Sequence, residues 1–117
     1  MTQEEKELLL KDLCARLPYN CRVFYEYVDN LDGKTYGYSL TLNTWCIDEL
    51  VANKAVIKPY LRPMSSMTEE ERQEYGLVLC DELSINQFDW LNRKMFDYRG
   101  LIPKGLALEA KEWMYNN

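Results

Sequence analysis

The stretch CRVFYEYVDNLDGKTYGYSLTL, residues 21–42, decides the fold because two alternating runs flank a turn signal. Side chains of a strand point alternately to its two faces, so a regular alternation of apolar residues predicts a strand with one buried face. Each run puts three apolar residues on one face, namely Val23, Tyr25 and Tyr27 in the first and Tyr38, Leu40 and Leu42 in the second. The stretch therefore predicts an antiparallel hairpin.

The turn between the two runs sets the predicted register. Asp32 and Gly33 fit a two-residue hairpin turn, in which glycine supplies the positive φ that such turns require. With that turn, Tyr25 would face Leu40 and Tyr27 would face Tyr38, so that the apolar faces of both strands coincide.

The residues before the hairpin predict a helix. TQEE, residues 2–5, is a capping box, in which the Thr2 hydroxyl and the Glu5 carboxylate satisfy each other's backbone amides. Pro18 would end the helix, because the residue before a proline avoids helical backbone angles. Apolar residues at three- and four-residue spacing predict its buried face, namely Leu9, Leu10, Leu13, Cys14 and Leu17.

The segment after the hairpin, TWCIDELVANK at residues 44–54, fits two structures. Its apolar residues suit a short helix capped by Asn43 or Thr44, and they suit a third strand about as well. We favour the helix. Because a hairpin alone is marginal in water, this segment or Val56 and Ile57 would supply an added strand.

The C-terminal half carries two more helix starts. TEEE, residues 68–71, is a second capping box, and SINQ, residues 84–87, is a third. The apolar stripes that follow are Tyr75, Val78, Leu79 and Leu83 in one helix and Ile85, Phe88, Leu91 and Met95 in the next. Residues 106–115 are good helix formers, but the sequence leaves open whether this tail is helical. We expect one α+β domain over residues 1–117, with an N-terminal helix, a small antiparallel sheet and a helical C-terminal half.

Composition and charge exclude several classes of function. The net charge of −5 disfavours nucleic acid and anionic membranes as partners. Neither a signal peptide nor a membrane span is recognisable. The four cysteines, Cys14, Cys21, Cys46 and Cys80, show no CxxC spacing and lie in or beside apolar runs. We therefore expect a reduced, cytoplasmic location.

The sequence also lacks a recognisable reaction chemistry. It contains no histidine, the commonest general base near neutral pH and the commonest metal ligand. Neither GxxxxGK[ST] nor GxGxxG occurs, and no partner base is evident for a cysteine nucleophile. Tyr98 with Arg99 and Lys104 is the best enzymatic candidate, but such a set specifies no reaction class. We expect no enzyme activity, no cofactor and no metal.

The charges are uneven along the chain. Residues 54–66 carry a net charge of +3, residues 67–89 carry −6 and residues 90–108 carry +3. Prolines 59, 63 and 103 stiffen the two basic segments, which lowers the ordering cost of binding. Arginine beside tyrosine combines charged donors with a flat apolar face. These features predict one binding site, formed by Tyr60, Arg62, Tyr98, Arg99 and Lys104.

A purely structural role for the same segments stays open. KPYLRP, residues 58–63, would then be a stiff crossover from the sheet to the helices. Arg62 and Arg99 would only pair with the glutamates of residues 69–74, in surface ion pairs that contribute about 0–1 kcal/mol each.

Three segments resemble a known family. MTQEEKELLLKDLCARLPY, KPYLRPMSSMTEEE and FDYRGLIPKGLALEA, of 19, 14 and 15 residues, cover 48 of the 117 residues. They are similar to short proteins encoded by gut Bacteroides-type bacteria and by their phages and mobile elements. The family has no assigned activity or catalytic residues, so the resemblance implies no functional residue. The chain departs from the family pattern at Lys111 and Trp113, where the family has proline and glycine.

Two hypotheses for the function follow. Nine tyrosines and three tryptophans are typical of a protein interface, because these side chains combine a large apolar body with a polar tip. The first hypothesis is a small non-enzymatic interaction protein, a phage or mobile-element accessory protein that binds a host protein or itself. The alternative is a binder of a nucleotide or another small anion, which would use a cationic, aromatic pocket.

Overall fold

The computed structural model describes residues 1–79 and 84–115, and for residues 77–86 it describes no side chains. The chain forms an α+β domain of helices and one sheet, as the sequence predicts. In chain order the elements are α1 (Gln3–Arg16), the 3₁₀ turn η1 (Leu17–Tyr19), β1 (Arg22–Val28), β2 (Thr35–Thr41), α2 (Thr44–Val51), β3 (Val56–Leu61), η2 (Met64–Ser66), α3 (Glu69–Leu79), α4 (Ser84–Arg93) and β4 (Leu108–Glu109).

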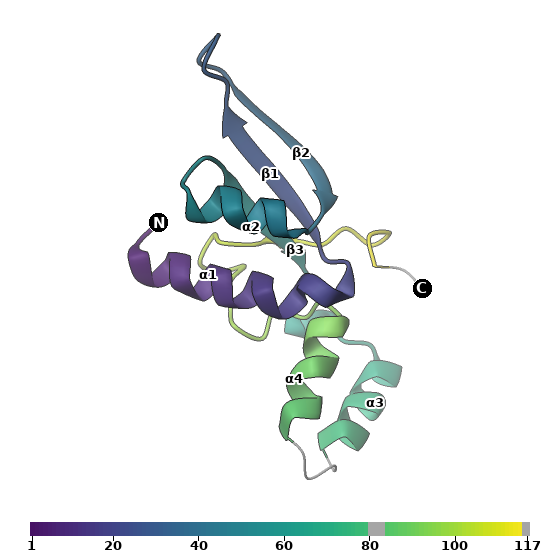
Figure 1. Cartoon of the computed structure of the whole chain (residues 1–117). Helices are drawn as coiled ribbons and strands as arrows, with labels where there is room; N and C mark the ends of the chain where they lie inside the picture. The colour runs from purple at the N-terminus through teal and green to yellow at the C-terminus, as the bar shows by residue number, and fades with distance from the viewer. Residues whose placement is uncertain (80–83, 116–117) are drawn as a thin grey trace.

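The sheet has the strand order β2-β1-β3-β4, with β1 antiparallel to both of its neighbours and β4 parallel to β3. Helices α1 and α2 pack on one face of it, and the β1–β2 hairpin extends past them (Figure 1). The core between helices and sheet contains Leu9, Leu13, Val23, Tyr25, Cys46, Leu50, Ile57 and Leu61. The α3–α4 pair lies at the opposite end of a molecule that measures 54 × 28 × 24 Å (Figure 1).

The hairpin is present, but its predicted register and turn are wrong. Tyr25 faces Tyr38 and Tyr27 faces Tyr36, a displacement of two residues from the predicted pairs. The loop spans residues 30–33, because the Asp29 amide pairs with the Lys34 carbonyl and Gly33 adopts a φ of +71°. A shift of two residues preserves the face of every side chain, so the apolar pattern could not distinguish the two registers.

Residues 44–51 are helical, as favoured above, and Asn43 caps the helix by accepting a hydrogen bond from the Cys46 amide at 3.0 Å. The added strand is also confirmed, and it is longer than Val56 and Ile57 because β3 continues to Leu61. KPYLRP is therefore mostly strand and only partly crossover. Pro59 faces Val23 in β1. On the other side of β3, pairing with β4 begins only at Tyr60. Pro59 therefore occupies a position in β3 where its nitrogen needs no hydrogen-bond partner.

The predicted buried face of α1 is partly wrong. Leu9 and Leu13 are buried as expected, but Cys14 is exposed. Asp12 and Arg16, neighbours at i and i+4 on the same helix, are completely buried instead. The apolar spacing missed them because a charged pair is buried only when tertiary partners satisfy it.

The C-terminal half is helical only in part. The second capping box is confirmed, since the Glu71 amide donates to the Thr68 hydroxyl and the Thr68 amide donates to Glu71. In α4, Leu91 is buried, Phe88 is half exposed, and Met95 is buried just beyond the helix with a φ of +64°. The side chains of Val78, Leu79, Leu83 and Ile85, and those of the third capping box up to Asn86, lie outside the described residues.

The tail from residue 106 to 115 forms no helix. It contributes β4 and then turns, and its last described side chain, Tyr115, docks on the sheet. The Tyr115 hydroxyl accepts from the Arg22 amide at 2.8 Å and donates to the Tyr60 carbonyl at 2.7 Å, so it joins the ends of β1 and β3. Backbone pairing with β3 and this bridge outweigh the helix propensity of the tail. In the described part of the chain no helix is long and apolar enough to cross a membrane.

Candidate protein-interaction surface

Tyr60 lies near the end of β3, where β4 of the C-terminal tail pairs with it. Its side chain is 7% exposed, and its hydroxyl is 3.1 Å from the Ser39 hydroxyl of β2. The position on β3 turns the ring onto the sheet, so Tyr60 offers little surface to a partner.

Arg62 follows directly after β3 and is held within the protein. Its guanidinium donates two hydrogen bonds to the Glu71 carboxylate, at 2.7 and 2.6 Å, and lies 4.2 Å from the centre of the Phe96 ring. The Arg62 amide and carbonyl also pair with Met95 and Asp97. This bidentate pair joins the start of α3 to the sheet edge, and the arginine acts as a structural connector.

The Arg62–Glu71 pair makes stability depend on pH. Its hydrogen bonds hold the pKa of Glu71 at about 2, below the ordinary value of 4.5. A lowered pKa in the folded state stabilises the fold above pH 4.5, and this contribution disappears as the pH falls toward 2. We expect Glu71→Gln to lower the free energy of unfolding by about 1–3 kcal/mol at pH 7 and to have little effect at pH 2.

Urea unfolding at pH 7, 4 and 2 measures this difference. Glu70→Gln is the matched control, because Glu70 is an exposed neighbour in the same helical turn. A cost for Glu71→Gln that stays constant from pH 7 to pH 2 would contradict the assignment.

Tyr98 and Arg99 belong to a buried ion network around Asp12. The Asp12 carboxylate accepts from Arg16 Nε at 2.9 Å, from Arg16 Nη2 at 3.1 Å and from Arg99 Nη1 at 2.7 Å. Arg16 Nη2 also donates to the Phe96 carbonyl at 2.6 Å. The Tyr98 ring lies against both guanidiniums, with its hydroxyl on Asn92 at 3.1 Å.

This network is a tie between α1 and the segment after α4. It brings Tyr98 and Arg99 together. Arg99 forms its ion pair with Asp12 and not with the glutamates of residues 69–74. Arg16 Nη1 is buried without a hydrogen-bond partner among the described residues. The hydrogen-bonding groups of the network are therefore satisfied only in part. For this reason the Asp12 carboxylate, which pairs with both arginines, is important for the fold.

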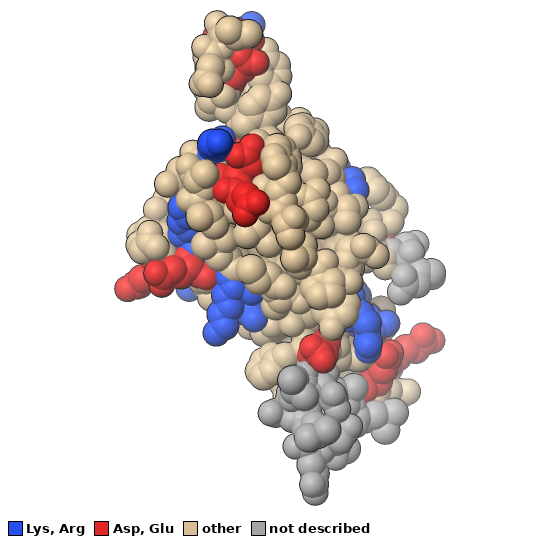
Figure 2. All heavy atoms as spheres, in the orientation of Figure 1, with Lys and Arg blue, Asp and Glu red and all other residues tan. Residues whose placement is uncertain are grey.

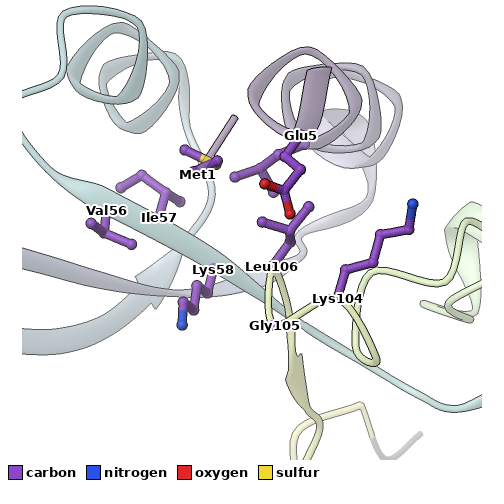
Figure 3. Close-up of a pocket in the computed structure, with 9 residues that line it drawn as sticks. Met1, Glu5, Val56, Ile57, Lys58, Lys104, Gly105 and Leu106 are labelled. Carbon is purple, nitrogen blue, oxygen red and sulfur yellow. The ribbon is translucent and has the colours of Figure 1, made fainter. Parts of the chain in front are cut away.

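Lys104 lies elsewhere, at a cavity of about 330 Å³ between the start of α1, β3 and the loop before β4. The floor is apolar, from Leu9, Ile57 and Leu106, and the lysine side chains of residues 58 and 104 extend away from it (Figure 3). The cavity therefore offers apolar surface with the Glu5 carboxylate at its side and no converging cationic groups. The structure thus brings Tyr98 and Arg99 together, but it engages Tyr60, Arg62 and Lys104 in different contacts.

A different set of aromatic side chains does gather on one surface. We call Tyr25, Tyr27, Tyr36, Tyr38 and Trp45 the aromatic row. Trp45 of α2 stacks on Tyr25 with ring centres 4.9 Å apart, and Tyr38 lies 5.3 Å from Tyr25. Tyr27 continues the row at 5.6 Å from Tyr25 and 6.0 Å from Tyr36. All four tyrosines share the face of the hairpin on which α2 packs.

The row is exposed at its outer members. Tyr36, Tyr38 and Trp45 are between 42% and 45% exposed, whereas Tyr25 is buried beneath them. The hairpin that carries Tyr36 and Tyr38 extends past α1 and α2 (Figure 1), and Trp45 lies on the first turn of α2. Charged side chains are sparse along the hairpin between its tip and the body of the molecule (Figure 2). The row is therefore an apolar, rigid platform with polar tips.

Hydrogen bonds to carboxylates hold two of these tyrosines in place. The Tyr25 hydroxyl donates to Glu49 at 3.3 Å, and burial together with that carboxylate raises the pKa of Tyr25 to about 12. The Tyr36 hydroxyl donates to Asp32, which raises the pKa of Tyr36 and lowers that of Asp32. Both of these rings are therefore neutral near pH 7.

Two observations concern the reactive side chains of the described residues. Burial raises the pKa of Cys21 to about 11, so its thiol stays protonated near neutral pH. No group of three or more histidine, cysteine, aspartate or glutamate side chains is placed to hold a metal ion in residues 1–79 and 84–115.

The sequence indicated the aromatic row only through composition. The abundance of tyrosine and tryptophan predicted an interface, but the alternating tyrosines were assigned to the core face of the hairpin. They do lie on that face, where α2 covers Tyr25 but leaves Tyr36 and Tyr38 almost half exposed. Comparison with protein-family models, with curated proteins and with solved structures finds no match for this chain.

Proposed function

We propose that this protein is a small, non-enzymatic interaction protein that binds a protein partner through the aromatic row. The observation that carries the proposal is the contiguous group of five aromatic rings, four on the projecting hairpin and one on α2, with three of them nearly half exposed. Tyrosine and tryptophan are enriched where protein interfaces concentrate their binding energy, because they bury large areas at low entropic cost.

The partner would be a protein with an exposed apolar or aromatic segment. The rings are fixed by mutual stacking and by hydrogen bonds to Asp32 and Glu49, so little side-chain freedom is lost on binding. The resemblance to short proteins of phages and mobile elements motivates a host protein as the target. We therefore propose a host protein as the partner.

The alternative, a binder of nucleotides or other small anions, has less support. Such a site needs guanidinium or ammonium groups that converge on one space. Arg62 and Arg99 already pair with Glu71 and Asp12, and Lys104 lies at a separate, apolar cavity. An anion would have to displace two well-formed ion pairs.

Trp45→Lys tests the proposal most directly, because Trp45 contributes the largest exposed ring of the row and lies outside β2. Purified wild-type protein, immobilised through its N-terminus, captures its partner from an extract of the native host, and the identified partner is then titrated against each variant. We expect Trp45→Lys to weaken binding at least tenfold. Phe88→Lys is the matched control, since Phe88 is a helical aromatic residue with 48% exposure on α4.

Circular dichroism and melting temperature establish that both variants are folded. If Trp45→Lys and Phe88→Lys bind the captured partner as the wild type does, the aromatic row is not the interface. If only Phe88→Lys weakens binding, the interface lies near α4.

A further inference from the structure

Among residues 1–79 and 84–115, nothing pairs with the backbone groups on the outer edge of β2. In an antiparallel pair, successive residues direct their amide and carbonyl alternately toward and away from the neighbouring strand. The bonds from Asp29 to Lys34 and from Leu42 to Cys21 fix which residues of β2 point inward. Those that point away from β1 are therefore Thr35, Gly37, Ser39 and Thr41, and β2 is an edge strand in the described sheet.

This edge lacks the features that normally prevent strands from pairing between molecules. Exposed edges are usually protected by charged residues, prolines, bulges or a covering element. The sequence of β2, TYGYSLT, contains no charge and no proline, and its pairing with β1 is regular over all seven residues. A bare, uncharged edge of this length is a strong template for a further strand.

We propose that two copies of this chain pair through antiparallel β2 strands, with Tyr38 of one copy facing Tyr38 of the other across a two-fold axis. In this register Thr35 faces Thr41 of the second copy and Gly37 faces its Ser39. All four outward-pointing residues then form hydrogen-bonded pairs, and a shift by two residues in either direction leaves one of them unmatched. The two sheets become one continuous sheet.

The side chains are compatible with this register on both faces. One face brings Tyr38 onto Tyr38 and Tyr36 onto Leu40, which are favourable aromatic and apolar pairs. The other face pairs threonine with threonine and glycine with serine. Glu26, which faces Gly37 within one copy, would lie in line with Phe24 of the second copy and not with another glutamate. No like charges meet, although each chain carries a net charge of −5.

The pairing would also enlarge the proposed binding surface. Facing residues of neighbouring strands point to the same side of a sheet, so the two aromatic rows would join across the axis. The inference does not rest on the proposed function, because the edge would pair whether or not the rows bind a partner.

Analytical ultracentrifugation over a concentration series tests the proposal. Two variants place a charge at the axis, one positive and one negative. Tyr38→Lys and Tyr38→Glu each bring two like charges face to face, and we expect each to weaken the dimer at least tenfold. An equimolar mixture of the two variants should again sediment as a dimer. Phe88→Lys, on α4 at the far end of the molecule from the hairpin, should leave the dimer unchanged.

A disulfide tests the register. In a Cys14→Ser, Cys80→Ser background, Tyr38→Cys places two thiols at a facing pair, where a disulfide forms readily under mild oxidation. Tyr36→Cys is the matched control, because Tyr36 would face Leu40 and lie far from its own symmetry mate. Tyr38→Cys should give a covalent dimer and Tyr36→Cys should not.

Two outcomes overturn the proposal. One is a wild-type protein that sediments as a monomer at every concentration, and the other is a dimer that neither Tyr38 variant weakens. Neither outcome changes what the binding assay with Trp45→Lys measures. The experiments therefore distinguish a wrong dimer proposal from a wrong proposed function.

Discussion

Asp12→Ala is expected to lower the free energy of unfolding by about 3–5 kcal/mol. The Asp12 carboxylate is fully buried and accepts hydrogen bonds from two nitrogens of Arg16 and one of Arg99. Its removal leaves the Arg16 guanidinium buried with the Phe96 carbonyl as its remaining acceptor. An uncompensated buried charge is among the most costly defects that a single substitution can produce.

Equilibrium urea unfolding of the wild type and the variant measures this effect. Glu7→Ala is the matched control, because Glu7 is an exposed carboxylate on the same helix, and it should change stability by less than about 0.5 kcal/mol. The double variant Asp12→Leu, Arg16→Met should recover much of the loss, since it removes both charges. A cost for Asp12→Ala below about 1 kcal/mol would show that the network contributes little to the fold.

Trp90→Ala should lower the free energy of unfolding by about 3–5 kcal/mol as well. Trp90 is 1% exposed and is the largest side chain of a second small core, where it stacks on Phe96 at 5.7 Å and lies 5.2 Å from Tyr75. Its indole nitrogen donates to Glu74 at 2.9 Å. The residue thus holds α3 against α4, and truncation would leave a cavity between the two helices.

The expected signature is a loss of helical circular dichroism at lower urea concentration than for the wild type. Trp113→Ala is the control, because Trp113 is 67% exposed and its truncation opens no cavity. Trp90→Phe should cost less than Trp90→Ala, since it preserves part of the ring packing. Equal stabilities for Trp90→Ala and Trp113→Ala would contradict the role assigned to the second core.

Local signals in the sequence predicted most of the elements. The capping boxes at Thr2 and Thr68 are formed by residues three apart, and they mark the starts of α1 and α3. Alternation over residues 21–42 predicted both strands and the face that each side chain occupies. The capping boxes work because their energy comes from neighbours in the chain, whereas the alternation works because one face of each strand is buried.

The tertiary structure decided the features that depend on distant residues. Arg16 is buried on α1 because the Phe96 carbonyl, 80 residues away, accepts from it. The tail is not helical because Tyr115 bridges two strands, one of them 93 residues before it. The register of the hairpin came from the hydrogen bonds of its loop, which the apolar period of two residues leaves undetermined.

The same division applies to the candidate site. The sequence by itself determined that aromatic residues with polar tips are abundant and that Tyr25, Tyr27 and Tyr38 share one face. Only the tertiary structure decided that Tyr36 and Tyr38 are almost half exposed and that Trp45 stacks on Tyr25. It also decided that Arg62 and Arg99 meet carboxylates of the same chain. Exposure and ion pairing depend on which surfaces the helices cover, and that follows from how all the elements pack together.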